Sequence, residues 1–266
     1  RRNAKMKARN LPLILVLLAM ATWGGVTLLK PVKTSAILLS NATAAPLTGQ
    51  PDQLAVFVSI TNTGPYDQLL SAHAPDASET AFSETHGMLA LPENSSVSLA
   101  PDGVFIKLSS IAGALKDGRT FPISLTFANA GTVTTRARLS SPQEEGAASS
   151  FGLFGIGDIC QVGEGEPAPK IALSTARTDA GWTVTVMSDD FEFTPDLVDG
   201  PHVPGTGHGH IYINGLKLGR LYNPTATIGN LPLGQHEIRV TLSTNDHRAY
   251  IANEVPVTAS VLLHSQ

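Results

Sequence analysis

The stretch FPISLTFANAGTVTTRARL, residues Phe121–Leu139, decides the fold class. Hydrophobic residues alternate with Ser, Thr and Arg on both sides of an Asn-Ala-Gly segment, which is the pattern of two short strands joined by a turn. The same period of two, interrupted by Gly, Pro, Asn and Asp, recurs through the rest of the sequence beyond residue 50, and helical patterns are nearly absent there. The sequence therefore predicts an all-β protein.

Further strands are expected wherever the alternation returns. The predicted strands are Leu54–Thr61, Val104–Leu108, Ile123–Ala128, Thr132–Leu139, Ile171–Thr175, Trp182–Met187, His210–Asn214, Leu216–Tyr222, Glu237–Leu242 and Val255–Leu262. Between the two groups lies SSPQEEGAASSFGLFGIGDICQVGEGEPAP, residues 140–169, which is rich in Gly, Ser, Pro and Glu and shows no sustained period. Such a composition is typical of a linker.

An uncharged run, LPLILVLLAMATWGGVTLL, occupies the 19 residues Leu11–Leu29. As a helix it would extend for about 28 Å, enough to cross the hydrocarbon layer of a membrane. Five basic residues precede the run and two follow it, which places the N-terminus in the cytoplasm. We therefore expect a single-pass anchor in a bacterial inner membrane, with the bulk of the chain in the periplasm. The alternative is a cleavable signal peptide, because Ala42-Thr43-Ala44 before Ala45 has the form of a cleavage site.

These signals together predict a transmembrane helix followed by two β-sandwich domains of cupredoxin-like or immunoglobulin-like type. The expected segments are a basic tip and anchor (1–33), a linker (34–45), a first β domain (46–142), a second linker (143–169) and a second β domain (170–266). Each β domain has about 100 residues, which is enough for an independent core.

Charge and cysteine content restrict the partners of the exported part. Seven of the 18 Lys and Arg residues lie in residues 1–33, whereas all 22 Asp and Glu residues follow, so the remainder carries 11 basic and 22 acidic residues, a net charge of −11. This acidic balance argues against nucleic acid as a partner. Cys160 is the only cysteine, so no intrachain disulfide is possible, and it is expected to be a buried or linker thiol.

The first β domain resembles a known family through AVFVSITNTGPYDQLLSA (55–72) and SLAPDGVFIKLSSIAGALKDGRTFPISLTFANAGTVTTRARL (98–139). These segments are similar to the periplasmic copper chaperone family PCu(A)C, and the resemblance implies that family's small β fold. The family binds copper through two His and two Met, with one His-x-Met pair on the strand that here spans 104–108. Phe105 and Lys107 occupy the matching positions, and only His86 and Met88 remain upstream. We therefore expect this domain to keep the fold as a scaffold and to bind no metal.

Histidines concentrate in the second β domain: His202, His208, His210, His236, His247 and His264. His208 and His210 are two residues apart at the start of a predicted strand, so their rings project from the same face. If the strand 237–242 pairs antiparallel with this one, His247 lies near His208.

The candidate metal ligands are therefore His208, His210 and His247, with His202 as a fourth candidate, and imidazoles without thiolate suit copper or zinc. The alternative is that these histidines only bond turn backbone, with Asn245-Asp246-His247 forming a capped turn. GHGHIYINGLKLGRLYN and LPLGQHEIRVTLSTNDHRAY also resemble a small His-rich β domain of exported bacterial proteins, which supports the coupling of these histidines.

Catalytic motifs are missing from the sequence. It contains no Gly-x-Ser-x-Gly elbow, P-loop or His-Glu-x-x-His, so we expect no enzymatic activity. Two hypotheses follow. The first is a structural accessory subunit of a larger inner-membrane complex, built on a degenerate copper-chaperone fold. The second is a periplasmic copper or zinc binding and delivery protein that uses the C-terminal histidines.

Overall fold

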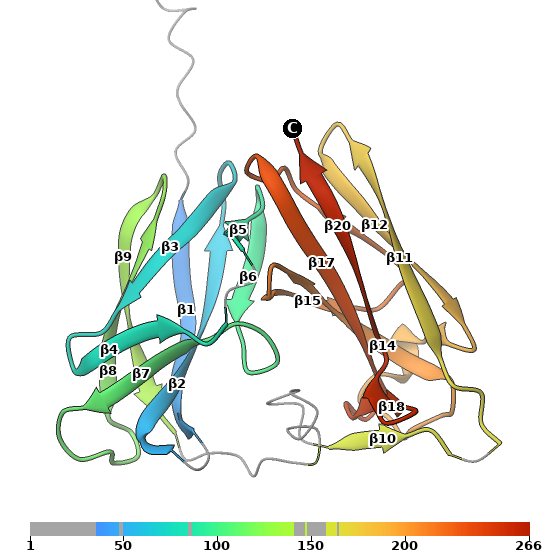
Figure 1. Ribbon diagram of the computed structural model, residues 1–266, viewed down its shortest axis with the longest axis horizontal. Coiled ribbons are helices and arrows are strands. Elements are labelled where there is room, and N and C mark those ends of the chain that lie inside the picture. The colour runs from blue at the N-terminus through green and yellow to red at the C-terminus, as the bar shows by residue number, and fades with distance from the viewer. Residues whose placement is uncertain (1–35, 48–49, 85–86, 141–146, 148–157, 164) are drawn as a thin grey trace, which may run out of the picture. The chain divides into compact units, whose positions relative to one another are not determined.

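The computed structural model describes residues 36–47, 50–84, 87–140, 147, 158–163 and 165–266, and Figure 1 shows them as strands with short connections. Apart from short 3₁₀ segments such as η2 (Pro195–Leu197), their regular structure is β, which confirms the predicted all-β class. No helix within these ranges is long and apolar enough to span a bilayer. The predicted anchor at 11–29 lies outside the described residues, so the structure gives it no support.

The first half of the described chain forms a sandwich of nine strands. They are β1 (Ile37–Leu47), β2 (Gln50–Asn62), β3 (Asp67–His73), β4 (Ala77–Phe82), β5 (Leu89–Leu91), β6 (Ser95–Leu99), β7 (Ile106–Ile111), β8 (Thr120–Phe127) and β9 (Gly131–Leu139). β8 and β9 pair as the predicted hairpin. Phe121, Ile123, Leu125 and Phe127 of β8 are buried, as the alternation requires, and they pack into the core.

Both predicted linkers are wrong in part, since the segment 143–169 contains a strand at Ile159–Gln161 and the segment 34–45 contains most of another. Residues 37–47 lie mostly within the segment 34–45 that was expected to connect the anchor to the first domain, and they form β1 instead. β1 pairs antiparallel with β2 and, through Thr43 and Ala44, parallel with β9. The run NATAAP lacks the large hydrophobic residues that mark a strand in sequence. Ala44 is nevertheless fully buried, because a small side chain suffices where β1 closes the sandwich between two neighbours.

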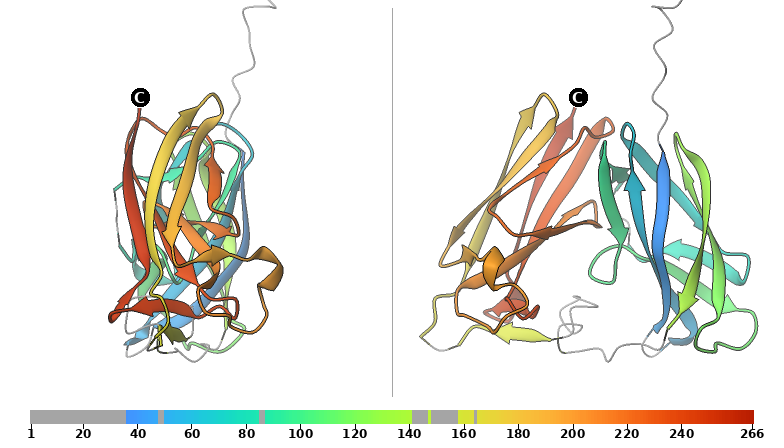
Figure 2. Two further views of the ribbon diagram at one scale, coloured as in Figure 1. Left: turned by 90° about the vertical axis from the view of Figure 1, so that its right-hand side faces the viewer. Right: turned by 180° about the vertical axis from the view of Figure 1, so that it is seen from behind.

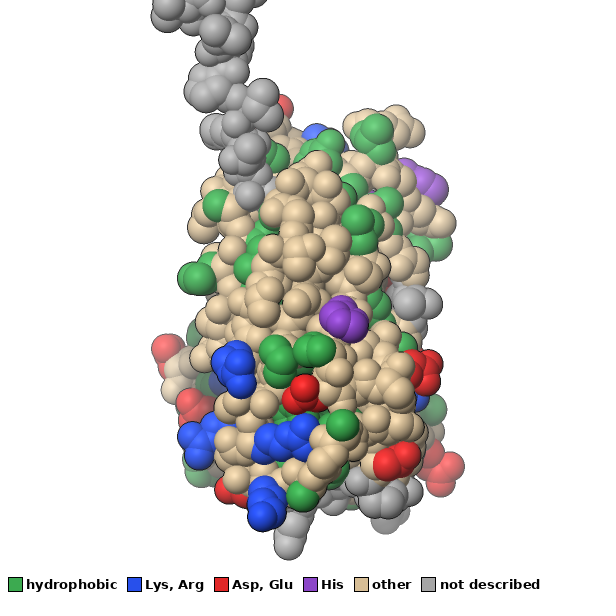
Figure 3. All heavy atoms as spheres, turned by 90° about the vertical axis from the view of Figure 1, so that its left-hand side faces the viewer, with side chains coloured by type: hydrophobic (Ala, Val, Ile, Leu, Met, Phe, Trp, Pro, Cys, Tyr) green, Lys and Arg blue, Asp and Glu red, His purple; other side chains and the backbone are tan. Residues whose placement is uncertain are grey.

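Uncharged hydroxyl side chains cover much of the outer face of β8 and β9. Figure 3 shows this side of the molecule, where Lys and Arg side chains gather toward one end. Ser124 and Thr134 lie across the hairpin with their hydroxyl oxygens 3.4 Å apart, and Thr126 and Thr132 do so at 3.1 Å. Cross-strand hydroxyl pairs of this kind support the pairing of the strands and leave a face that suits solvent.

The second half of the chain contains the remaining strands. They are β10 (Ile159–Gln161), β11 (Lys170–Thr178), β12 (Gly181–Asp189), β13 (Glu192–Phe193), β14 (Thr206–Ile213), β15 (Leu216–Leu221), β16 (Thr225–Ile228), β17 (Gly234–Ser243), β18 (Ala249–Ala252), β19 (Val255–Pro256) and β20 (Thr258–Ser265). Pairing gives one sheet in the order β15-β14-β17-β20 and a second sheet in the order β11-β12-β16. Figure 2 shows the β11–β12 hairpin alongside β20, so these elements form a second sandwich.

Residues 34–266 form one compact unit, and hydrogen bonds join the two sandwiches within it. Lys217 of β15 pairs with Ser98 of β6. Near this pair, the Val104 amide donates to the Gly215 carbonyl at 2.9 Å. A turn of the first sandwich, residues 100–104, is thereby held against the second sandwich.

Candidate metal centre

Strand β14 positions the candidate ligands. Ile211 and Ile213 on one face of this strand pack into the hydrophobic core. His208, His210 and Tyr212 therefore project from the opposite face, because side chains alternate along a strand. They are buried as well, with exposed fractions of 0, 7 and 0 %. β14 is thus covered on both sides, and its polar face is closed by other parts of the chain.

The register of β14 and β17 brings the third histidine into place. The two strands are antiparallel, as predicted, and His208 pairs with Ser243 at the end of β17. The turn that follows leads to His247, whose backbone takes a positive φ of 65°. The His208 ring centroid lies 5.2 Å from that of His210 and 5.0 Å from that of His247. The structure therefore brings together the three residues that the sequence grouped.

These three rings carry buried nitrogens that lack hydrogen-bond partners in the structure. Both ring nitrogens of His208, Nε2 of His210 and Nδ1 of His247 are of this kind, and so, among the described residues, is Nδ1 of His202. The other ring nitrogens of His210 and His247 are engaged by carboxylates. His210 Nδ1 lies 3.2 Å from Asp102 Oδ2, and His247 Nε2 contacts Asp199 Oδ1. A carboxylate on the far nitrogen is the usual arrangement of a metal-bound histidine, because it fixes the ring and its tautomer.

The spacing of the rings bears on whether they fit a metal. Imidazoles that bind one zinc ion place their nitrogens about 2.0–2.1 Å from it, and their ring centroids are then about 5 Å apart. The observed separations from His208, 5.2 and 5.0 Å, match this spacing. Within the described ranges, however, no group of three or more His, Cys, Asp or Glu side chains already converges on a metal position. The donor set and its unpartnered nitrogens suit the ion in chemical type, but the three rings do not converge on one metal position in the structure.

Burial also keeps the central rings neutral. Desolvation, helped by the neighbouring His210 and His247, lowers the pKa of His208 to about 3. Burial lowers the pKa of His210 too, although its hydrogen bond with Asp102 partly offsets this. A neutral imidazole keeps a lone pair, which is the form that binds a metal ion. Both rings are therefore in the binding form at neutral pH.

Asp102, from the turn at 100–104 of the first sandwich, joins the centre through a buried network. Its Oδ2 atom accepts hydrogen bonds from Tyr212 Oη at 2.7 Å and from Lys217 Nζ at 2.5 Å, besides its contact with His210. Burial alone would raise the pKa of Asp102, but the hydrogen bond with His210 and the charge of Lys217 hold it well below its ordinary value. Asp102 is therefore an ionised carboxylate with an exposed fraction of 6 %.

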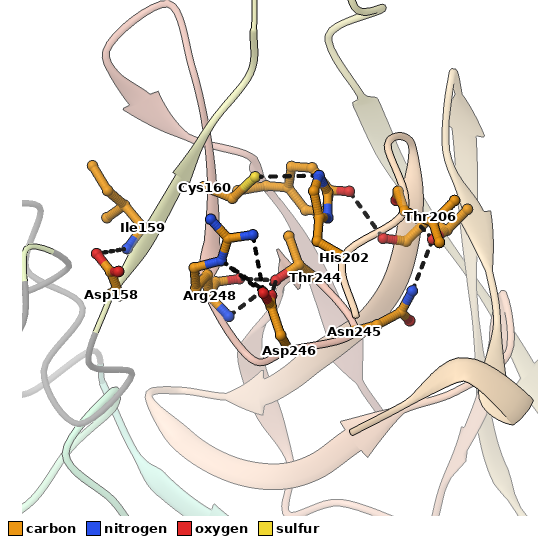
Figure 4. A network of polar contacts seen from close by, with 11 residues as sticks. Asp158, Ile159, Cys160, His202, Thr206, Thr244, Asn245, Asp246 and Arg248 are labelled. Atoms are coloured by element: carbon orange, nitrogen blue, oxygen red, sulfur yellow. Dashed lines mark hydrogen bonds and ion pairs between the residues drawn. The ribbon is translucent and has the colours of Figure 1, made fainter. Parts of the chain in front are cut away.

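His202, the fourth candidate, is engaged elsewhere. Its Nε2 lies 3.6 Å from the Cys160 Sγ, and its ring packs edge-on against Tyr250 with centroids 5.8 Å apart. Figure 4 shows this pair beside the Asp246–Arg248 ion pair. Burial raises the pKa of Cys160, so the thiol is protonated and buried, in agreement with the buried-thiol expectation. No ring contact between His202 and the three grouped histidines occurs in the described part of the chain.

His236 shows what a purely structural histidine looks like here. Its Nδ1 lies 3.0 Å from Asn214 Nδ2 and its Nε2 lies 2.9 Å from the Pro232 carbonyl, so both nitrogens are satisfied. His264 is exposed on β20. Neither belongs with the grouped histidines.

The capped-turn alternative describes the backbone but not the ring of His247. The Thr244 amide donates to the Arg248 carbonyl at 2.9 Å, and the His247 amide donates to the Thr244 carbonyl at 3.1 Å. The Thr244 hydroxyl also bonds Asp246. The turn is thus capped without the imidazole of His247, whose Nδ1 stays unpartnered.

The first sandwich has no comparable arrangement at the positions that the resemblance singled out. Phe105 packs edge-on against Phe57, with ring centroids 5.8 Å apart. Lys107 lies on β7, paired with Ala55 of β2 and Ala81 of β4. An aromatic contact and a cation stand where the family has its His-x-Met pair. His86 lies outside the described residues.

Sequence reasoning missed Asp102, Asp199 and Lys217. Asp199 is held near His247 by its amide, which donates to the Asn245 carbonyl at 2.9 Å. Asp102 lies 108 residues before His210. A single acidic residue in a Pro-Asp-Gly turn carries no signal of such a contact, since the docking of one sandwich on another is not visible in a local pattern.

Comparisons with known proteins find matches to the first sandwich. Residues 37–139 match the LpqE-like family of lipoproteins. A comparison with curated proteins gives no match. Among solved structures, the chain is similar to the copper-bound PCuAC domain from PmoF2, with 24 % identity over 42 % of this chain and 97 % of that one, and a TM-score of 0.36.

Two further structures give the same result. The apo PCuAC domain from PmoF1 has 20 % identity over 42 % of this chain and 98 % of that one, with a TM-score of 0.37. The Cu(I) form of DR1885 from Deinococcus radiodurans has 22 % identity over 42 % of this chain and 81 % of that one, with a TM-score of 0.34. The predicted resemblance to PCu(A)C is confirmed as a resemblance. At these TM-scores the matches assign no residue role to this chain.

Proposed function

We propose that this chain binds one copper or zinc ion outside the cytoplasm, through His208, His210 and His247. A single observation carries the proposal: three adjacent imidazoles present buried ring nitrogens that have no hydrogen-bond partner. Leaving such groups unpaired costs about 1–3 kcal/mol each. A metal ion would remove this cost for the three rings at once.

The donor set indicates the kind of metal. Neutral imidazoles without a thiolate suit copper and zinc, whereas magnesium and calcium prefer oxygen ligands. Cys160, the only thiol, lies with His202 and is no part of the donor set. The lipoprotein description of the matched family supports an exported, membrane-associated protein. The role we propose is binding of metal as cargo, without catalysis.

Metal titration of the full chain tests this function. We expect uptake of one equivalent of Zn(II) or Cu(II) in competition with a chelator of known affinity. Replacing His208, His210 or His247 with Gln, one at a time, should weaken uptake by at least about tenfold, because each loss removes one ligand. The matched control is His264→Gln, an exposed histidine, which should bind as the parent chain does. Equal binding by all four variants would contradict the proposal.

A second candidate function is the accessory subunit of an inner-membrane complex. Phe105 and Lys107 favour it, because a fold whose ligand positions hold an aromatic residue and a cation suits a scaffold. Gentle detergent extraction, followed by separation by size and metal analysis of the same fraction, distinguishes the candidates. Migration within a larger complex without bound metal would favour the accessory role. A free chain with one metal equivalent would favour metal binding.

A further inference from the structure

The docking of the turn at 100–104 brings a carboxylate of the first sandwich to the metal centre of the second. This turn is tight, because the Gly103 amide donates to the Ala100 carbonyl at 3.0 Å. The Val104 amide then reaches the Gly215 carbonyl. A Cβ atom on Gly103 would collide with that carbonyl oxygen, so only glycine allows this close approach. The backbone of the turn therefore fixes where the Asp102 side chain points.

We infer that Asp102 positions His210 for metal binding, so that the metal centre is a joint product of the two sandwiches; this inference rests on the proposed function. Asp102 Oδ2 and His210 Nδ1 are 3.2 Å apart and both side chains are buried. An ionised carboxylate can only accept a hydrogen bond, so His210 must carry its proton on Nδ1. The lone pair then lies on Nε2, the nitrogen that has no partner.

Lys217 makes this choice of tautomer depend on the carboxylate. Its Nζ also lies 3.2 Å from His210 Nδ1. An ammonium group can only donate, so by itself it would favour a lone pair on Nδ1 and a proton on Nε2. That tautomer leaves a proton, and no lone pair, on Nε2, the nitrogen without a partner. Asp102 prevents it by accepting hydrogen bonds from Lys217 and from His210.

The coupling has a consequence for the whole unit. If Asp102 strengthens the binding of metal at His210, bound metal must equally strengthen the docking of the turn at 100–104, since linkage between two equilibria is reciprocal. The first sandwich would then contribute to metal binding through one carboxylate, that of Asp102. Phe105 and Lys107 occupy the positions of the family's own ligands in this sandwich.

The test uses Asp102→Asn in the full chain, with two readouts. Chelator competition with Zn(II) should show affinity lower by about 10- to 100-fold, the usual effect of losing a partner of a metal-bound histidine. Long-range ¹H–¹⁵N spectra of the metal-free chain should show the His210 proton moving from Nδ1 to Nε2. The His208 and His247 signals should stay in place, whereas a general loosening of the structure would shift all three.

Two more variants keep the test decisive. Asp76→Asn makes the same chemical change at a carboxylate of the first sandwich that pairs with Arg119, so its zinc affinity should stay within about threefold of the parent. Gly103→Ala keeps every charge but displaces the turn, and it should lower zinc affinity as Asp102→Asn does.

The outcomes separate the two proposals. If the parent chain takes up no metal, the proposed function fails, while the tautomer of His210 in the metal-free chain still tests the positioning role. If the parent binds zinc through its histidines but Asp102→Asn binds equally well and His210 keeps its proton on Nδ1, the inference is overturned and the proposed function stands.

Discussion

Asp67 in the first sandwich and His208 in the second are buried in opposite ways. In the first, Asp67 is fully buried and its carboxylate accepts hydrogen bonds from the amides of Gln68, Asn129 and Ala130 at 2.8–2.9 Å. In the second, His208 is equally buried and neither ring nitrogen has a partner. Burying a polar group is costly unless it is paired. A saturated group such as Asp67 therefore serves the fold, whereas an unpaired group such as His208 points to a ligand.

The largest effect expected from this comparison is on stability, at Asp67. Asp67→Ala would leave three backbone amides without an acceptor, and the loss of hydrogen bonds to a charged group should lower the free energy of unfolding by about 3–5 kcal/mol. Urea denaturation, monitored by circular dichroism, measures the free energy of unfolding. Ser124→Ala, on the outer face, is the control and should change the free energy of unfolding by less than about 1 kcal/mol. A loss this small in Asp67→Ala would mean that the saturated network contributes little to the fold.

A smaller effect, dependent on pH, is expected at His208. Its pKa is about 3 in the folded chain and 6.5 in a model peptide, so below pH 6.5 the unfolded chain binds a proton that the folded chain does not. The contribution of His208 to stability is thus fully present above pH 6.5 and is lost as the pH falls toward 3.

The measurement is the free energy of unfolding of the metal-free chain between pH 7 and pH 4. His208 should contribute a slope of up to about 1.4 kcal/mol per pH unit, since that is the value for one proton. His208→Gln should flatten the curve, and His264→Gln should leave it unchanged. Parallel curves for the parent and His208→Gln would show that the buried ring does not resist protonation.

The sequence predicted the parts of this arrangement that depend on local alternation. The hairpin at 121–139 follows from a period-two pattern and a short turn, whereas the antiparallel pairing of β14 with β17 was expected because antiparallel pairing is the commoner case. The pairing in turn predicted that His247 lies near His208, because register fixes which ends of two strands meet. The predicted division into domains and the membrane anchor stay predictions.

Contacts between distant parts of the chain were not predictable in the same way. The burial of β14 is continuous from Gly207 to Ile213, without the alternation that a half-exposed strand shows. Its polar face is covered by a turn from residues 100–104, and no pattern in either segment records that contact. The same reason explains why Asp102 was missed.

The smallest effect concerns copper binding by the first sandwich, which we expect to contribute no copper uptake at all. A full chain in which His208, His210 and His247 are all Gln should take up no Cu(I) in competition with a chelator. Phe105 is packed against Phe57, and a cation at Lys107 would repel copper rather than donate to it. Further replacement of Lys107 by Met in this chain should also leave uptake unchanged, because one thioether gives copper a single donor. Sub-nanomolar uptake of one equivalent by the triple variant would contradict the comparison, since it would place a metal site in the sandwich where Phe105 and Lys107 hold the family's ligand positions.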